Sequence, residues 1–523
     1  MRTFSAAASR NRCFLRAWGA SALCLLWLGG CAPLPGWPDK ESLALSVPHT
    51  LSAGSAAARM AWPQDHWWRR YGSEQLNGLI DEALQGAPDM ALAAARVRHA
   101  QALLGVRISA RAPQLSAQAS ITTYKRSVNG DFNGDFNGGS PGAMALQAAN
   151  DASRLALQLD WSLDLWGKYR AAIAAAEGEL QARQADAAQT RLLLASSVAA
   201  AYAHLVRLSR TEHTLAQSVQ MRETTARLFA ERFANGLETQ GGVQSAQARW
   251  AAARAELAQV QEQVALQRNH LAVLVGAPPD RGAGIVVSAD SLQPPWQQHW
   301  ALPEHLPANL LGRRPDVVAA RLQAQALSAR VAVKQAQFYP DVNLAAFIGV
   351  QPLHLSRLLQ GDLNMGQVGP AISLPIFNAG RLQAELGAAR AGYAEAVALY
   401  QQTLNQALRE VADNAVRQRA LQRQLAARQQ AVDAAAQAQR VARDRYEGGL
   451  ASYLEVLTAE DQWLGNVRQL VEVQADALSL DIDLHRALGG GWQAPADTQV
   501  AVACADSRSS ADFSSLTCEG RHD

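Results

Sequence analysis

The sequence predicts a protein of mixed α and β structure that is built from two copies of one unit, with strands about long enough to cross a membrane. Three observations support this fold class: short segments in which apolar and polar residues alternate, very long segments without proline, and an internal repeat. The repeat is clearest between RFANGLETQGGVQSAQARW, which begins at Arg232, and RYEGGLASYLEVLTAEDQW, which begins at Arg445. These stretches align without a gap at an offset of 213 positions (445 minus 232), and the same offset separates Gly167 from Gly380.

The alternating segments are the predicted strands. In LALQLDWSLDLW, the residues Leu155 to Trp166, every second side chain is large and apolar, as expected for a strand with one apolar and one polar face. VGPAISLPIF, residues 368–377, repeats the pattern with Val368, Pro370, Ile372, Leu374 and Ile376. Weaker strands are expected after Pro113 and Pro340, so each half carries one hairpin, at about 113–166 and about 340–377. Such strands are about long enough to cross a bilayer at a tilt.

Long helices are expected after each hairpin. No proline occurs between residues 380 and 447, and small or apolar residues recur there in steps of three and four, as in a coiled-coil seam. A helix of this length would reach roughly 100 Å. The equivalent segment from 167 to about 235 should match it. Turns are expected at 235–239 and 448–452.

These elements predict the following organisation: a first repeat over 73–276, an equatorial linker over 277–313, a second repeat over 314–490 and a polar tail over 491–523. Residues 1–30 are a predicted signal peptide with a basic start and an apolar core. LGGC, which ends at Cys31, resembles the lipobox of bacterial lipoproteins, and Ala32 after it implies sorting to the outer membrane. Residues 31–72 would then be a lipidated tether and wrapping segment; ordinary cleavage near Cys31 is the alternative.

The other bulk properties exclude several classes of protein. The hydrophobic fraction of 49% and the charged fraction of 18% are typical of a folded chain. Removing the four arginines of residues 1–30 changes the formal charge of +2 to −2, so we expect no nucleic acid as a partner. Cys504 and Cys518 could form a disulfide in an exported tail, or remain two free thiols. We predict no enzyme activity, metal or cofactor, because no nucleophile elbow, phosphate loop or HExxH motif occurs.

Four strands do not close a barrel by themselves, because about eight are needed. An open edge in hydrocarbon leaves backbone groups without hydrogen bonds, at several kcal/mol each. If the strands lie in a membrane, the chain must therefore associate with copies of itself. Two copies would supply eight strands and three would supply twelve, and this argument alone does not choose between them.

Three stretches resemble signatures of one family: residues 306–344, WSLDLWGKYR from Trp161, and LPIFNAGR from Leu374. They are similar to the TolC-like outer membrane factors, and most of all to the lipidated, NodT-like branch that serves RND-type tripartite efflux systems. The resemblance implies a homotrimer with a twelve-stranded β-barrel in the outer membrane, continuous with a long α-helical barrel in the periplasm. It also implies three partners, namely a periplasmic adaptor (membrane fusion) protein, an inner-membrane RND-type transporter and outer-membrane lipid. The implied function is a lipid-anchored exit duct for toxic small molecules.

The same resemblance assigns the candidate site residues. Gly236-Leu237 and Gly449-Leu450 resemble the two helix-turn-helix tips to which adaptors dock; ordinary capped turns are the alternative. Glu455 matches a lumen-facing carboxylate of related channels, so three copies would form an acidic ring that favours cations. Asp444 and Arg445 are further gate candidates, expected to pair with neighbours across the gate, although exposed helix charges are usually only solvated.

Two further expectations concern aromatic residues. Side chains in the strands or near their ends could form an interfacial belt, or pack in the core or between subunits: Tyr124, Trp161, Trp166, Phe347 and Phe377. The cluster WPQDHWWRRYG, residues 62–72, resembles the wrapping segment of the family. Alternative functions are a duct for type I protein secretion and a passive or structural pore lipoprotein.

Overall fold

A computed structural model of the protein describes residues 62–124, 150–287, 312–350 and 365–494. The predicted signal peptide, the lipidation site Cys31 and the pair Cys504 and Cys518 lie outside these residues. The chain divides into two compact units. The sheet unit joins Arg107–Ile173 to Ser328–Ala394, and the helix unit holds the other described residues.

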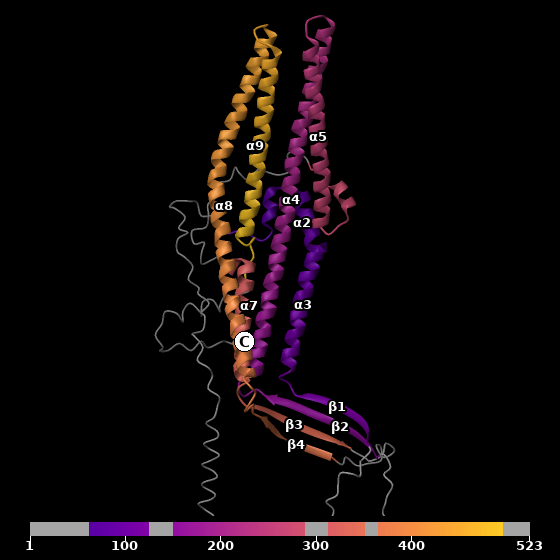
Figure 1. The fold of residues 1–523 in the computed structure, drawn as a ribbon, viewed down its shortest axis with the longest axis vertical. Coiled ribbons are helices and arrows are strands. Elements are labelled where there is room, and N and C mark those ends of the chain that lie inside the picture. Colours follow the sequence, from indigo (N-terminus) through magenta and orange to yellow (C-terminus); the bar gives the residue numbers. More distant parts are fainter. Residues whose placement is uncertain (1–61, 125–149, 288–311, 351–364, 495–523) are drawn as a thin grey trace, which may run out of the picture. The chain divides into compact units, whose positions relative to one another are not determined.

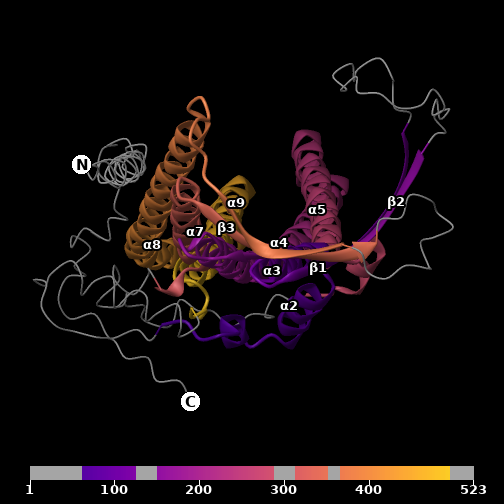
Figure 2. The ribbon, with the colours of Figure 1, turned by 90° about the horizontal axis from the view of Figure 1, so that it is seen from below.

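The sheet unit contains the predicted hairpins. β1 (Gln114–Tyr124), β2 (Asn150–Leu163), β3 (Asp341–Val350) and β4 (Met365–Ser373) form one antiparallel sheet in the order β1-β2-β3-β4 (Figure 1). Figure 2 shows the same strands from below. Each half of the sequence therefore supplies one hairpin, and β2 and β3 join the two hairpins into a single sheet.

The register of the strands gives the sheet one apolar and one polar face. Residues directly opposite each other share a face, and Leu157 lies opposite both Ala117 and Ile348. The apolar face comprises Leu115, Ala117, Ala119, Ile121, Leu155, Leu157, Leu159, Trp161, Leu163, Val342, Leu344, Ala346, Ile348, Val368, Pro370 and Ile372. Many of its large side chains are exposed within the single chain, for example Leu115, Leu157 and Val368. The expected division into an apolar and a polar face is confirmed for these strands.

The second strand of each hairpin ends earlier than the alternation predicts. β2 ends at Leu163 and β4 ends at Ser373, so the predicted strand positions of Leu165, Leu374 and Ile376 are wrong. Pro375 has no N–H for a strand ladder. After β2, the Asp164 carboxylate accepts hydrogen bonds from the backbone N–H groups of Tyr169 (3.0 Å) and Arg170 (2.9 Å), which turns the chain into a helix.

Two pairs of long helices follow the hairpins. α4 (Lys168–Ala234) and α8 (Arg381–Glu447) each have 67 residues, and α5 (Gln240–Leu274) and α9 (Tyr453–Ala487) each have 35. α8 begins 213 residues after α4 (381 minus 168), and α9 begins 213 residues after α5 (453 minus 240). This is the offset of the internal repeat in the sequence. Figure 1 shows α5 beside α4 and α9 beside α8. The predicted seam of α8 is largely buried, at Leu382, Leu386, Ala396, Tyr400, Leu404, Ala407 and Val411.

Shorter helices complete the structure. They are η1 (Trp67–Tyr71), α2 (Glu74–Gly86), α3 (Pro88–Ser109), η3 (Pro279–Gly284) and α7 (Pro315–Ala336). The largest apolar core joins η1 and α2 to the middle of α4 and to α5, and it includes Leu478 and Ile482 of α9. Among the described residues, α4 is the one helix that is long and apolar enough to cross a membrane, but 67% of its most apolar window is buried.

The two units do not coincide with the two repeats that the sequence predicts. Each repeat contributes one hairpin of strands to the sheet unit and one pair of long helices to the helix unit. Packed structure also continues past residue 490, where the sequence predicts the polar tail. Ala494 is buried, and its N–H donates to the carbonyl of Gly312 at 3.4 Å.

Candidate functional site: the paired helix turns

The turn between α4 and α5 is fixed by backbone hydrogen bonds. Gly236 has a φ of 70°, a backbone conformation that glycine adopts readily but that strains residues with a side chain. The N–H of Leu237 donates to the carbonyl of Arg232 at 2.9 Å, and that of Gly236 donates to Phe233 at 3.0 Å. This pair of bonds is the Schellman motif, which ends a helix at a glycine. Thr239 then caps α5 by accepting from the N–H of Gly242 at 3.1 Å.

The turn between α8 and α9 has the same construction. Gly449 has a φ of 72°, and the N–H groups of Leu450 and Gly449 donate to Arg445 (2.8 Å) and Tyr446 (3.0 Å). In both turns the residue after the glycine is a leucine with an exposed side chain: Leu237 is 66% exposed and Leu450 is 75% exposed. A Schellman motif usually covers an apolar residue at this position. The two leucines are therefore apolar groups for which the described part of the chain provides little cover.

Contacts between the two helix pairs hold the turns near each other. Arg232 donates to the hydroxyl of Tyr446 at 2.5 Å and also lies over its ring. Tyr453, just after the second turn, shares a hydrogen bond of 2.8 Å with Thr225 of α4. Burial raises the pKa of Tyr453, so its hydroxyl keeps its proton. Further along, Asp461 accepts from both Arg222 (2.8 Å) and Arg249 (3.0 Å).

The gate candidates lie beside the second turn. Arg445 forms an ion pair of 3.4 Å with Glu455, and it also donates to the carbonyl of Leu450 at 3.4 Å. Arg445 thus has a partner within its own turn, whereas the sequence suggests partners across the gate. Asp444 contributes its backbone carbonyl, which accepts from Gly448 at 2.9 Å. Both members of the ion pair are about half exposed, so it adds little to stability.

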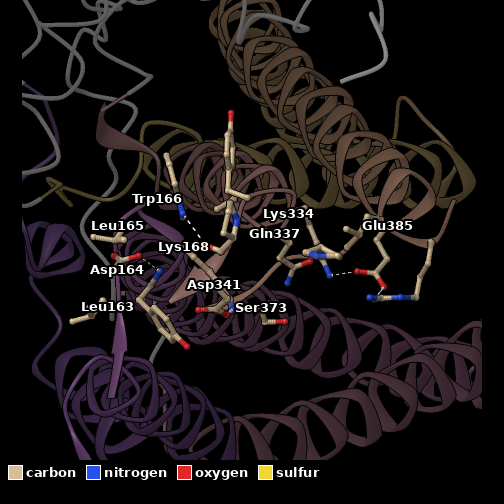
Figure 3. A pocket seen from close by; sticks show the side chains of 17 residues that line it. Leu163, Asp164, Leu165, Trp166, Lys168, Lys334, Gln337, Asp341, Ser373 and Glu385 are labelled. Carbon is tan, nitrogen blue, oxygen red and sulfur yellow. Dashed lines mark hydrogen bonds and ion pairs between the residues drawn. The ribbon is translucent and has the colours of Figure 1, made fainter. Parts of the chain in front are cut away.

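A second candidate site is a cavity of about 510 Å³ in the sheet unit, where the strands end and three helices begin or end (Figure 3). Its charges are paired within the chain. Lys168 binds Asp341 at 2.8 Å, and Glu385 binds both Lys334 (2.9 Å) and Arg381 (2.6 Å). Because each of these cations already has a carboxylate, the cavity is better explained as the attachment of the strands to α4, α7 and α8 than as a binding site.

The aromatic residues proposed for an interfacial belt occupy different positions. Trp161 lies on the apolar face and donates its indole N–H to the carbonyl of Arg111 at 3.2 Å. Trp166 lies beyond β2, and its ring stacks on that of Tyr339 with the centroids 4.9 Å apart. Its indole N–H donates to the carbonyl of Pro340 at 2.8 Å. Phe347 pairs with Gln158 and is on the polar face, below the guanidinium of Arg154. A belt on the apolar face is therefore wrong for Phe347.

Phe377 and Tyr124 complete that set. Phe377 lies four positions beyond the end of β4 and is 89% exposed. Tyr124 is the last residue of β1.

A buried cation that the sequence does not predict holds the second half together. Arg314 is 5% exposed and binds Asp316 at 2.6 Å and Glu410 at 2.9 Å, and it donates to the carbonyl of Ala487 at 3.2 Å. Hydrogen bonds and charge from these carboxylates outweigh burial and raise the pKa of Arg314. The RRPD motif gives a signal for Asp316, but Glu410 and Ala487 are too distant in sequence to predict.

No group of three or more histidine, cysteine, aspartate or glutamate side chains that could hold a metal ion occurs in the described ranges.

A sheet with an exposed apolar face is typical of membrane proteins whose strands contact lipid. This chain combines such a sheet with two pairs of long helices, and the turn within each pair carries an exposed leucine. Comparison with known proteins identifies its family. Residues 79–277 and 306–490 match the family described as outer membrane efflux protein, with one matched segment in each half of the chain. The chain belongs to this family, whose members are efflux proteins of the outer membrane and not enzymes.

Individual relatives agree with this assignment. The chain is 30% identical over 457 residues to the multidrug resistance outer membrane protein MdtP of Escherichia coli (strain K12), covering 87% of this chain and 91% of that protein. The crystal structure of the outer membrane protein VceC of Vibrio cholerae matches with 43% identity and a TM-score of 0.73, over 83% of this chain and 100% of VceC. The outer membrane channel CmeC of Campylobacter jejuni has a TM-score of 0.77 at 22% identity, over 89% of this chain and 96% of CmeC, which shows a shared fold.

Proposed function

We propose that the protein is the exit duct of a tripartite efflux pump, and that its two helix turns are the sites at which a periplasmic adaptor docks and opens it. The observation that carries this proposal is the pair of similar turns, each with an exposed leucine after a glycine in Schellman geometry. Leu237 and Leu450 present apolar side chains at the ends of helix pairs, where helices of a partner can pack against them.

The edges of the sheet support a homotrimer. β1 and β4 each pair with one neighbour in the four-stranded sheet, so each has one edge without a strand partner among the described residues. Closing such edges between copies would satisfy the backbone groups in a membrane. Three copies would form a barrel of twelve strands, the number that the resemblance to the TolC-like family implies. The exposed apolar face would then contact lipid, and lipidation at Cys31 would add an anchor.

The cargo that fits this duct is toxic small molecules. MdtP is named for multidrug resistance, and an aqueous tunnel needs no specific pocket for its cargo. Energy and selectivity would come from the inner-membrane transporter, since the sequence has no phosphate-binding loop. Export of proteins by a type I system is the alternative, and so is a passive pore.

Photo-crosslinking in living cells tests the proposal. A photo-reactive residue replaces Leu237 or Leu450, and captured proteins are identified by mass spectrometry. Leu266 is the matched control, because it is a leucine of α5 that is 58% exposed but lies away from the turn. We expect capture of an adaptor protein that works with a proton-driven pump at both turn positions and not at position 266.

The other outcomes separate the alternatives. Capture of the adaptor of an ATP-driven exporter would indicate protein or peptide secretion. Capture of no adaptor by an assembled outer-membrane oligomer would contradict docking at the turns and favour a passive pore. Equal capture at position 266 would show that the turns have no special role.

A further inference from the structure

The segment of residues 62–72, here called the strap, is attached to the helix unit by a buried polar network. Trp67, Trp68 and Tyr71 of the strap are almost completely buried. Tyr71 donates its hydroxyl to Asp481 of α9, and Trp67 stacks on His485 of α9 with ring centroids 5.0 Å apart. Asp481 is 4% exposed and His485 is 2% exposed. Two titratable side chains thus meet in the core beneath the strap.

The hydrogen bonds of His485 define its protonation state. Arg70 of the strap donates to Nε2 at 3.0 Å. Because a guanidinium has no acceptor, Nε2 carries no proton. Nδ1 lies 2.8 Å from the backbone carbonyl of Asp481 and donates to it. His485 is therefore neutral, and burial lowers its pKa to about 4.

For Asp481, by contrast, the surroundings favour the protonated carboxyl group. Its Oδ2 accepts from Tyr71, but Oδ1 is buried and has no hydrogen-bond partner in the described part of the chain. Asp481 also lines a small, mostly apolar cavity of about 30 Å³, to which α8 adds the amides of Asn414 and Gln418; it has room for one water molecule. An ionised carboxylate in this position is costly, and protonation removes the buried charge. Burial raises the pKa of Asp481 to about 7.

Few other titratable groups face this pair. The strap contributes Arg70 and Tyr71, and α8 contributes amide side chains to the cavity. α4 contributes apolar side chains and Tyr202, whose hydroxyl is bonded to Ser73 at 3.1 Å. Asp481 and His485 are one helical turn apart, with Nδ1 and Oδ2 separated by 3.7 Å.

We propose that Asp481 and His485 act as one unit that holds a single proton while the strap is docked, so that the strap stays attached with nearly the same strength in acidic and neutral media. In the docked state the proton is on Asp481. When the strap is released and water enters, the proton moves to His485, which is the stronger base in water. The number of bound protons then changes little, and docking depends only weakly on pH.

The two contributions have opposite signs. For Asp481 the pKa rises from 3.8 to about 7 on docking, so its stabilising contribution is present below pH 3.8 and is lost as the pH rises through about 7. For His485 the pKa falls from 6.5 to about 4, so its contribution is present above pH 6.5 and is lost as the pH falls toward about 4. Between pH 5 and pH 8 the two contributions should therefore largely offset each other.

Single substitutions should reveal the pH dependence that each of the two residues contributes to docking of the strap. Asp481→Asn keeps a neutral side chain at all pH values, so the strap should loosen more than about tenfold from pH 8 to pH 5 because of His485. His485→Gln removes the other titration, so the strap should loosen more than about tenfold from pH 5 to pH 8 because of Asp481. The measurement is hydrogen exchange of the peptide over residues 64–72 in the full-length protein, corrected for the intrinsic effect of pH on exchange.

Two outcomes would overturn the proposal: pH responses of the same sign in both variants, or no response in either. A second measurement on the unmodified protein covers the case in which a variant fails to fold. Nitrogen NMR signals should show His485 neutral, with its proton on Nδ1, at pH 5, where a free histidine is charged. A charged His485 at that pH would contradict the shared proton.

Discussion

At the scale of single residues, backbone conformation decides where the two helix pairs turn. Gly236 and Gly449 have φ values of 70° and 72°, and for both glycines an added Cβ would meet no atom within 4 Å. Space is therefore available at both positions, and the constraint comes from the backbone alone. Glycine occupies them because left-handed backbone is costly for residues with a side chain.

A pair of adjacent glycines tests this reading. Gly449→Ala should destabilise the second turn by about 1–2 kcal/mol, because alanine is strained at positive φ. Gly448→Ala is the matched control, since Gly448 lacks a positive φ and its nearest contact would be the Asp444 carbonyl at 3.4 Å. Hydrogen exchange of residues 445–455 should rise in the first variant and stay near the original rate in the second. Equal exchange in both would refute the assigned strain.

A run of glycines after α9 has a different cause, which is close packing. Gly489, Gly490 and Gly491 all have positive φ, and added Cβ atoms would meet the Arg313 carbonyl, the Leu192 side chain and the backbone at Gln64 within 2.5 Å. The sequence shows these glycines, but not the distant segments that crowd them. Their role in holding residues 62–72 and 312–314 against α9 becomes visible only in the folded chain.

At the scale of elements, the period of each segment determines its two faces. Strand pairing places Leu157 opposite Ala117 and Ile348, whereas Gln158 lies opposite Ser116 and Phe347. Side chains that are adjacent in sequence therefore face opposite environments. This is the ordinary consequence of a two-residue period in a sheet.

Lysine substitutions at these neighbouring positions should have different effects. Leu157→Lys should cost about 2–4 kcal/mol if the apolar face contacts lipid near the middle of the bilayer, and should reduce the amount of assembled protein in the outer membrane. Gln158→Lys, on the polar face, should leave assembly nearly unchanged. The measurement is the amount of oligomer extracted from outer membranes. Equal loss in both variants would show that the apolar face does not meet lipid.

The ends of the elements follow local chemistry that the period does not show. Alternation continues through Leu165 and Ile376, yet the strands end at Leu163 and Ser373. Asp164 ends β2 by capping α4. Partial burial favours its protonation, but the N–H groups of Arg170 and Tyr169 outweigh it and lower the pKa of Asp164. The long helices were easier to predict, because proline-free segments with regular seams leave few alternatives.

At the scale of the whole molecule, the charge of the proposed gate depends on an ion pair. Glu455 could contribute to an acidic ring in a trimer, but Arg445 lies 3.4 Å from it and offsets its charge. The cation preference of the channel should therefore depend on both residues. Bilayer recordings on the isolated channel can measure that preference.

We expect Glu455→Gln to weaken cation block or cation selectivity, and Arg445→Gln to strengthen it by leaving the carboxylate without its counter-charge. Glu223→Gln is the control, because Glu223 is paired with Arg227 at 3.1 Å on α4, away from the second turn. Unchanged conductance and ion preference in both gate variants would show that these charges are only solvated side chains.

The sequence by itself determined the elements of this protein and its family. The two-residue period gave the strands, the long seams gave the helices, and Gly236 and Gly449 gave the turns between them. These features are local, because each depends on residues a few positions apart. The partners of buried polar groups were decided only by the tertiary structure: Arg314 with Glu410, Tyr71 with Asp481, and Arg232 with Tyr446. Such pairs join residues that are far apart in the chain, and no local pattern specifies which buried charge or hydroxyl will satisfy which other.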